Sequence, residues 1–304
     1  MSALGNTPGM VPNPMHSLTP SGNLRRRQLT SRLFVTLTVA AAGLAVAVLL
    51  ILVYYAAKNG ASQLSLSFLT AQLPAPGGIV PGGGMGPALV GTAEVILIAT
   101  IIALPVGVLT AIYLSEFAGR RIGRVLTTAL EQMAGVPTIL VGVFIFGLVV
   151  AHFGQSAIAA GLALAIVEVP LIARASIESL RRVPGTLREA ADALGVARWR
   201  TILGVILPTA ANGIVTATIL AVARAAGETA PVLLTCLPVG QGYQLDPRQP
   251  VATVPVEILQ LLLSGQTSTV DKAWGAAFLL MGLILLVNIG ARVWLRRSER
   301  KRGV

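Results

Sequence analysis

Two charged residues, Arg224 and Glu228, lie inside the apolar stretch ILAVARAAGETAPVLL, which runs from Ile219 to Leu234. An arginine near the centre of a bilayer costs about 2.5–3.5 kcal/mol on insertion scales, so both side chains should face a bundle interior or a watery cavity. At a spacing of four they would share one helix face and could simply neutralise each other, although arginine before glutamate is the less favourable order. Because a guanidinium fork matches a tetrahedral oxyanion, the alternative is that Arg224 contacts an anion or holds a gate. Glu228 would then exchange with it, and Thr229 belongs to the same predicted pathway.

A second pair with the same spacing, Arg174 and Glu178, lies near the end of another apolar run. Anchoring at the membrane–water boundary is the favoured interpretation, and Arg174 is kept as a second candidate for an anion pathway. Glu168, two residues before Pro170, is either a ligand at a helix break or a buried acid with a partner. The two histidines are far apart in the sequence, so no histidine-based metal or catalytic site is predicted.

The composition is that of a membrane protein. The 304 residues are 54% hydrophobic and 12% charged, and the mean hydropathy is +0.78. A soluble domain would carry about twice that charge. Several continuous apolar runs approach the roughly 20 residues that cross a bilayer as a helix. The sequence therefore predicts an all-α integral membrane protein with about six transmembrane helices.

The distribution of the net charge of +11 indicates how the chain is oriented in the membrane, and it does not indicate a nucleic-acid partner. Basic residues gather in clusters that alternate with long segments nearly free of them, as in the positive-inside pattern. The clusters are residues 25–32, 120–124, 181–200 and 292–302. We therefore expect both termini on the cytoplasmic side of the membrane, and no nucleic-acid partner.

Hydropathy divides the chain into five regions. They are a disordered basic tail over residues 1–32, a first transmembrane helix over 33–57, an extracytoplasmic Gly/Pro-rich segment over 58–87, a core over 88–295 and a basic cytoplasmic tail over 296–304. Within the core, spans are predicted at residues 88–117, 136–151, 157–177, 202–225 and 273–295. The span at 157–177 should be interrupted at Glu168 and Pro170.

The basic loop over residues 180–200 predicts a short exposed helix. Thr186 and Glu189 stand in capping-box relation, which favours a helix start at this point. Gly195 can end the helix in the left-handed conformation. A small apolar face lies between them, formed by Ala190, Ala191 and Leu194. Such a low-relief face suits docking into a groove of another protein, and a plain interfacial helix between spans is the alternative.

These residues also carry a resemblance. The segment resembles the EAA signature of ABC importer permeases, EAA-x3-G-x9-I-x-L-P, with Val205 in place of the isoleucine. The matching positions are Glu189, Ala190, Ala191, Gly195, Leu207 and Pro208. In that family the segment is the coupling helix, which sits in a cleft of a cytoplasmic ATPase. The resemblance therefore implies the type-1 ABC importer permease fold and an ATPase-coupling role for these six residues.

Four further segments narrow the family. They are PGGGMGPALVGT (Pro81–Thr92), YLSEF (Tyr113–Phe117), EQMAGVPTILVGVF (Glu131–Phe144) and RAAGETAPVLLT (Arg224–Thr235). These resemble phosphate importers of the Pst type, and the GETAP form is closer to the A-type permease than to the C-type. The resemblance implies a heterodimer with a C-type permease subunit, a dimer of ATP-binding subunits and an extracytoplasmic phosphate-binding protein.

The chain itself has no visible machinery for hydrolysis. A P-loop needs lysine followed by serine or threonine, but Lys58, Lys272 and Lys301 are followed by asparagine, alanine and arginine. We therefore expect no cofactor in this chain, with ATP and Mg bound by the partner ATPase. Two other functions remain open on the sequence. One is import of another oxyanion such as sulfate, molybdate or phosphonate, and the other is a passive channel or membrane scaffold.

Overall fold

The computed structural model describes residues 24–73, 83–238 and 240–302, and within these ranges every regular element is a helix. The chain divides into two units, Met1–Val53 and Tyr54–Val304. The described residues contain five helices long and apolar enough to cross a membrane, or up to six if a bent pair counts as one span. The prediction of an all-α protein with about six spans is confirmed.

Helix α1 (Leu24–Gly60) fills the described part of the first unit and continues into the second. It begins earlier than the tail prediction allowed. Residues 1–23 of the predicted tail lie outside the described residues, but residues 24–32 are helical, so the prediction of disorder is wrong there. This stretch contains neither glycine nor proline, and its leucine, arginine and glutamine residues are good helix formers.

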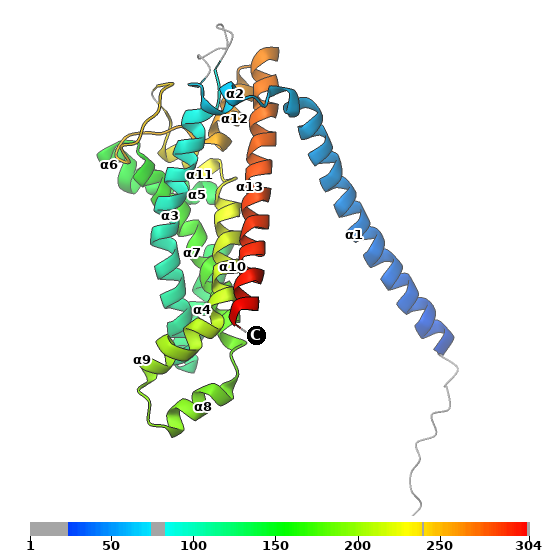
Figure 1. The fold of residues 1–304 in the computed structure, drawn as a ribbon, viewed down its shortest axis with the longest axis vertical. Helices are drawn as coiled ribbons and strands as arrows, with labels where there is room; N and C mark the ends of the chain where they lie inside the picture. Colours follow the sequence, from blue (N-terminus) through cyan, green and yellow to red (C-terminus); the bar gives the residue numbers. More distant parts are fainter. Residues whose placement is uncertain (1–23, 74–82, 239, 303–304) are drawn as a thin grey trace, which may run out of the picture. The chain divides into compact units, whose positions relative to one another are not determined.

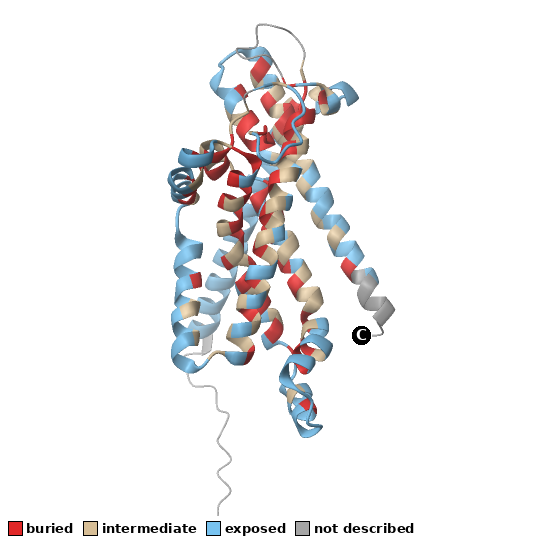
Figure 2. Cartoon of the chain, turned by 90° about the vertical axis from the view of Figure 1, so that its left-hand side faces the viewer, coloured by how far each residue is buried: buried red, intermediate tan, exposed pale blue. Residues whose placement is uncertain are grey.

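The second unit is built on two parallel helices, α3 (Gly86–Ile112) and α7 (Ala157–Arg181). In Figure 1 they lie side by side along the bundle. The buried face of α3 repeats every four residues with small side chains: Gly91, Val95, Ala99, Ala103, Gly107 and Ala111. Such a stripe lets two helix backbones approach closely, which is the usual way that membrane helices gain packing energy. Figure 2 shows the buried residues concentrated along this interior.

Gly161 of α7 tests how tight this contact is. A Cβ at this position would meet the side chain of Ile98 on α3, only 2.8 Å from the Ile98 Cβ. We expect Gly161→Ala to destabilise the protein by about 1–3 kcal/mol, as overpacking of a core does, and to lower its thermal denaturation temperature in detergent. Gly282→Ala is the matched control because an added Cβ there meets nothing within 4 Å. Equal stability of the two variants would contradict this close packing.

Proline does not interrupt either of these helices. Helix α7 is continuous from Ala157 to Arg181 through Pro170, and α3 is continuous through Pro105. The predicted interruption at Glu168 and Pro170 is therefore wrong. Proline is tolerated inside membrane helices when neighbouring groups satisfy the backbone carbonyl that it frees.

The remaining helices complete the bundle. Helix α4 (Arg120–Gly135) is followed by a bent continuation, α5 (Thr138–Ile145), the π-helical η4 (Phe146–Val150) and α6 (Ala151–Phe153); the bend is 95°. Another apolar span runs from Arg198 to Ala225 and comprises α9 (Arg198–Thr201), the π-helical η5 (Ile202–Ile206) and α10 (Leu207–Ala225). After a break comes α11 (Ala230–Thr235). The last span belongs to α13 (Thr267–Arg302).

Short helices mark the two ends of the bundle. Helix α8 (Gly185–Ala193) lies at one end, which we call the α8 end, and α2 (Leu66–Thr70) and α12 (Val254–Leu263) lie at the opposite end (Figure 1). Helix α12 is too short to cross a membrane and packs against α13 and α3. It is thus a packed helix at this end of the bundle.

Candidate functional site: the α8–α9 loop and the break after α10

Helix α8 begins and ends at well-defined residues. Its first residue is Gly185, preceded by Pro184 in an extended conformation, and no side chain caps its N-terminus. The predicted capping box of Thr186 and Glu189 is therefore wrong, because the helix starts before Thr186. The predicted C-terminal end is present: Gly195 has φ +67°, and its N–H donates to the Asp192 carbonyl at 3.0 Å. The N–H of Val196 donates to the Ala191 carbonyl, which completes a Schellman motif.

The two sides of α8 differ in what they contact. Ala191 is buried against the protein, and Arg188 lies partly buried on the same side. Glu189 and Ala190 are exposed, and Leu194 is 81% exposed. Ala190, Ala191 and Leu194 therefore do not form the single face that was predicted. The exposed apolar face consists of Leu187, Ala190 and Leu194, which follow the helical spacing of three and four.

The last two residues of the motif, Leu207 and Pro208, lie elsewhere. They form the first turn of α10, directly after the π-helical η5. Leu207 packs with a buried cluster that includes Leu180 and Val183 at the end of α7. These two residues support the span that follows the loop, and they are not part of the exposed face of α8.

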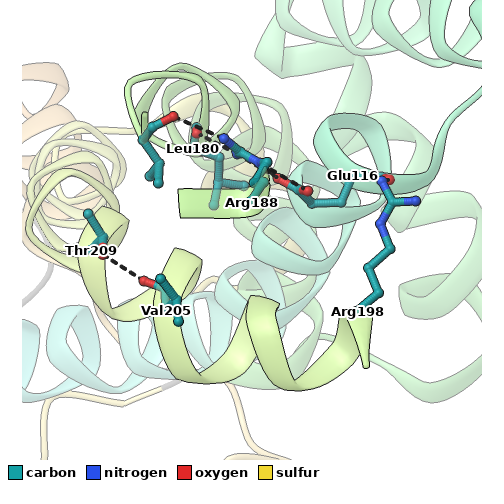
Figure 3. Close-up of polar contacts among 7 residues, drawn as sticks. Glu116, Leu180, Arg188, Arg198, Val205 and Thr209 are labelled. Atoms are coloured by element: carbon teal, nitrogen blue, oxygen red, sulfur yellow. Dashed lines mark hydrogen bonds and ion pairs between the residues drawn. The ribbon is translucent and has the colours of Figure 1, made fainter. Parts of the chain in front are cut away.

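A buried carboxylate, which the sequence reasoning did not single out, holds the loop in place. The side chain of Glu116, in the last turn of the α3 span, is 3% exposed and pairs with Arg188 of α8 at 2.7 Å (Figure 3). The Arg188 Nε also donates to both carboxylate oxygens, at 3.2 and 3.3 Å. Arg188 further donates to the carbonyls of Val183 and Leu180 at the end of α7. The only available signal was Glu116 within the YLSEF segment, where an acid follows a long apolar run.

Arg198, at the start of α9, reaches the same turn. Its guanidinium donates to the Glu116 carbonyl and lies over the Phe117 ring, 5.1 Å from the centroid. A cation over an aromatic face is attracted by the ring quadrupole. Both helices of the loop are thus attached to the end of the α3 span.

Arg224 and Glu228 lie at a break between two helices. Helix α10 ends at Ala225, and α11 begins at Ala230. The prediction that the pair shares one continuous helix face is therefore wrong. Nε of Arg224 is nevertheless 3.8 Å from Oε1 of Glu228. The side chain of Arg224 is 60% exposed and that of Glu228 is 16% exposed. One long contact leaves most of the guanidinium free.

Glu228 points into the protein. Together with the side chains of Thr92 and Thr253 it lines a cavity of about 10 Å³ between α3, α7 and the break. At about 1.5 Å per residue, the α3 lining residues 92–96 lie about 9–15 Å inside its first residue, Gly86. The charged pair is therefore located in the half of the bundle opposite α8. Thr229 faces a separate, open apolar groove lined by residues of α11 and α12.

Arg174 and Glu178 are both exposed on α7, and the structure, over the residues it describes, records no ion pair between them. Gly213 of α10 abuts Ser179 of α7, and the two helices run antiparallel. At about 1.5 Å per residue, Arg224 therefore lies about 9 Å further from the α8 end than Arg174. No contact recorded among the described residues brings the two arginines together.

Two acids of the described bundle have carboxylate oxygens that are shielded from solvent. They are Glu168 of α7, which is fully buried and faces Thr100 of α3, and Glu94 of α3, which is half-buried. Neither is close to enough other ligands to hold a metal, since the described residues include no cluster of three or more His, Cys, Asp or Glu side chains that could do so.

Residues 103–303 match the family model of the binding-protein-dependent transport system inner membrane component. The chain belongs to this family. The permease is 38% identical over 240 residues to the phosphate transport system permease protein PstA of Yersinia pestis, covering 77% of this chain and 79% of the relative. It is 37% identical over 233 residues to PstA 1 of Mycobacterium tuberculosis, strain CDC 1551 / Oshkosh, covering 74% and 76%. The predicted resemblance to A-type phosphate permeases is confirmed.

Solved structures show the same fold for the permease. The inward-facing MetNI methionine ABC transporter matches with a TM-score of 0.56 and 22% identity, covering 70% of this chain and 96% of that one. A bacterial ABC transporter for import of the polysaccharide alginate matches with a TM-score of 0.52 and 15% identity, covering 69% and 78%. The type-1 ABC importer permease fold is therefore confirmed, and the permease is a multi-pass membrane component of an ABC importer.

Proposed function

We propose that the permease carries inorganic phosphate across the bacterial inner membrane as one subunit of an ATP-driven importer. The observation that carries this proposal is its 38% identity to a phosphate transport permease over 240 residues. The substrate assignment follows the relatives, which are named as phosphate transport proteins, whereas the fold alone also serves methionine and alginate transporters.

The exposed face of α8 is the proposed docking surface for the ATPase. Its apolar side chains Leu187, Ala190 and Leu194 project away from the bundle, while Arg188 and Ala191 attach the helix to it. An exposed helix with fixed ends and small central side chains can enter a cleft without steric hindrance. ATP and Mg are then bound by two copies of the partner ATPase, and this chain needs no cofactor.

Arg224 is the proposed anion contact. A guanidinium that is 60% exposed in one chain would be costly against lipid. This cost is avoided if the side chain faces a second permease subunit across an aqueous path, which also places it where phosphate passes. The predicted partner there is a C-type permease, and an extracytoplasmic phosphate-binding protein delivers the anion to the end opposite α8.

The proposed orientation places the α8 end and both termini in the cytoplasm. The basic residues that support it are Arg120, Arg121 and Arg124 at the start of α4, and Arg181, Arg182, Arg198 and Arg200 around the α8–α9 loop. Positive charge is retained on the cytoplasmic side of most membrane proteins.

Uptake in cells tests the substrate and the energy source together. A strain lacking this permease should lose high-affinity uptake of labelled phosphate and regain it with the wild-type gene. A tenfold excess of unlabelled phosphate should suppress the signal about tenfold, whereas sulfate, molybdate or phosphonate should not. Suppression by one of those anions would assign the importer to it. Uptake that persists without the partner ATPase would indicate a passive channel.

A further inference from the structure

The last turn of the α3 span has an irregular geometry that turns Glu116 inward. Residues Tyr113–Phe117 form a π-helical turn in which the Ala118 N–H donates to the Tyr113 carbonyl at 2.8 Å. The buried stripe of α3 advances by four residues up to Ala111, but its next fully buried member is Glu116, five residues later. The π turn supplies this extra residue, and such turns are frequent at functional sites.

Glu116 joins the α3 span to the α8–α9 loop, which the chain does not connect to α3 directly. The α8–α9 loop is covalently continuous with α7 before it and with the α10 span after it. It has no such continuity with α3. Among the described residues, the recorded polar and cation–π contacts between this loop and the α3 span all involve Glu116 or Phe117. Glu116 is thus the main polar attachment of α3 to the loop.

The attachment is rigid for a single pair. Three bonds link the Arg188 guanidinium to the Glu116 carboxylate, and the same guanidinium also holds two carbonyls of the α7 end. A planar fork that donates to several acceptors at once fixes orientation as well as distance. Arg188 lies on the bundle-facing side of α8, whereas the face that is proposed to receive the ATPase consists of the exposed Leu187, Ala190 and Leu194.

We propose that Glu116 is a positioning residue that couples α3 to the motion of α8. This inference rests on the proposed function, because it requires an ATPase that pushes on α8. When α8 moves, Arg188 carries the ends of α3 and α7 with it, and the α10 span follows through the chain. Without Glu116, α8 can still bind the ATPase and move, but α3 is left behind and the pathway does not open fully.

The test uses the complete importer, with both permease subunits, the ATPase and the binding protein, reconstituted into liposomes. For Glu116→Gln we expect the ATPase to copurify within about twofold of the wild-type amount. Phosphate transport should fall at least tenfold while ATP hydrolysis stays within about twofold of the wild-type rate, so the number of ATP molecules consumed per phosphate should rise at least fivefold. A residue with a merely structural role would change the amount of complex and leave this ratio unaltered.

Two further variants make the result decisive. Glu131→Gln removes an exposed acid on α4 and is the matched control, with an expected ratio equal to that of the wild type. Arg188→Lys keeps the positive charge but loses the fork, and should give an intermediate ratio even if Glu116→Gln assembles poorly. A wild-type ratio in Arg188→Lys or in assembled Glu116→Gln would overturn the inference and leave the proposed function standing. Failure of the wild-type permease to bind the ATPase would instead overturn the proposed function.

Discussion

Replacing Arg224 with glutamine is expected to lower phosphate uptake about tenfold to about a hundredfold while the permease reaches the membrane at its normal level. The guanidinium makes one contact of 3.8 Å with Glu228 and is otherwise exposed, so its loss removes little from the folded chain. A charge-assisted hydrogen bond to an anion is worth about 1.5–3 kcal/mol, and each 1.4 kcal/mol corresponds to about tenfold in affinity. The measurement is labelled-phosphate uptake, normalised to the permease detected in membranes.

Arg248→Gln is the matched control for this prediction. Arg248 is also exposed and lies at the same end of the bundle, in the loop between α11 and α12, where only its backbone N–H is recorded bonding to Asp246. The neutralised Arg248 variant should transport at the wild-type rate. Wild-type uptake by Arg224→Gln would show that the Arg224–Glu228 pair only neutralises itself, which is the other interpretation that the sequence allows.

Hydropathy and basic clusters are strong sequence signals because the bilayer imposes them on every span. The apolar runs at 88–117 and 202–225 correspond to helical spans at Gly86–Phe117 and Arg198–Ala225. Gly195 was predictable for a similar reason, since a positive φ at the end of a short helix strongly favours glycine. Such features depend on one segment of the chain at a time.

Features that depend on tertiary contacts were missed or misplaced. Glu116 and Arg188 are 72 residues apart in the sequence, and nothing in either segment alone pairs them. The π turn at Tyr113–Phe117 shifts the buried face by one residue, which a regular helical period cannot anticipate.

Backbone conformational preferences account for two other wrong predictions, the continuous helix through Arg224 and Glu228 and the capping box of α8. The apolar run continues past Ala225, yet the helix ends there. Gly227 is a poor helix former, and Pro231 has no N–H to donate to the Gly227 carbonyl four residues earlier. At α8, Pro184 already supplies an extended residue before the first turn, so the helix starts without the side-chain cap that Thr186 was predicted to provide.

Replacing Gly195 with valine is expected to uncouple the importer, reducing phosphate uptake at least tenfold. Gly195 has φ +67°, and a β-branched residue is a steric outlier in that conformation, at a cost of about 1–2 kcal/mol. An added Cβ would meet no atom within 4 Å, so the strain falls on the backbone and not on packing. Relieving it breaks the two closing bonds to Asp192 and Ala191 and loosens the connection between α8 and α9.

The location of the damage determines what else should change. Because the strain is confined to the end of α8, the permease should still assemble, and copurifying ATPase should stay within about twofold of the wild-type amount. Gly185→Ala adds the same kind of bulk at the start of α8, where φ is ordinary and space is open, so it should transport normally. If Gly195→Val transported phosphate as well as Gly185→Ala, the geometry at the C-terminus of helix α8 would have no part in coupling. In that case the role of the motif would lie in Leu207 and Pro208, which support the α10 span.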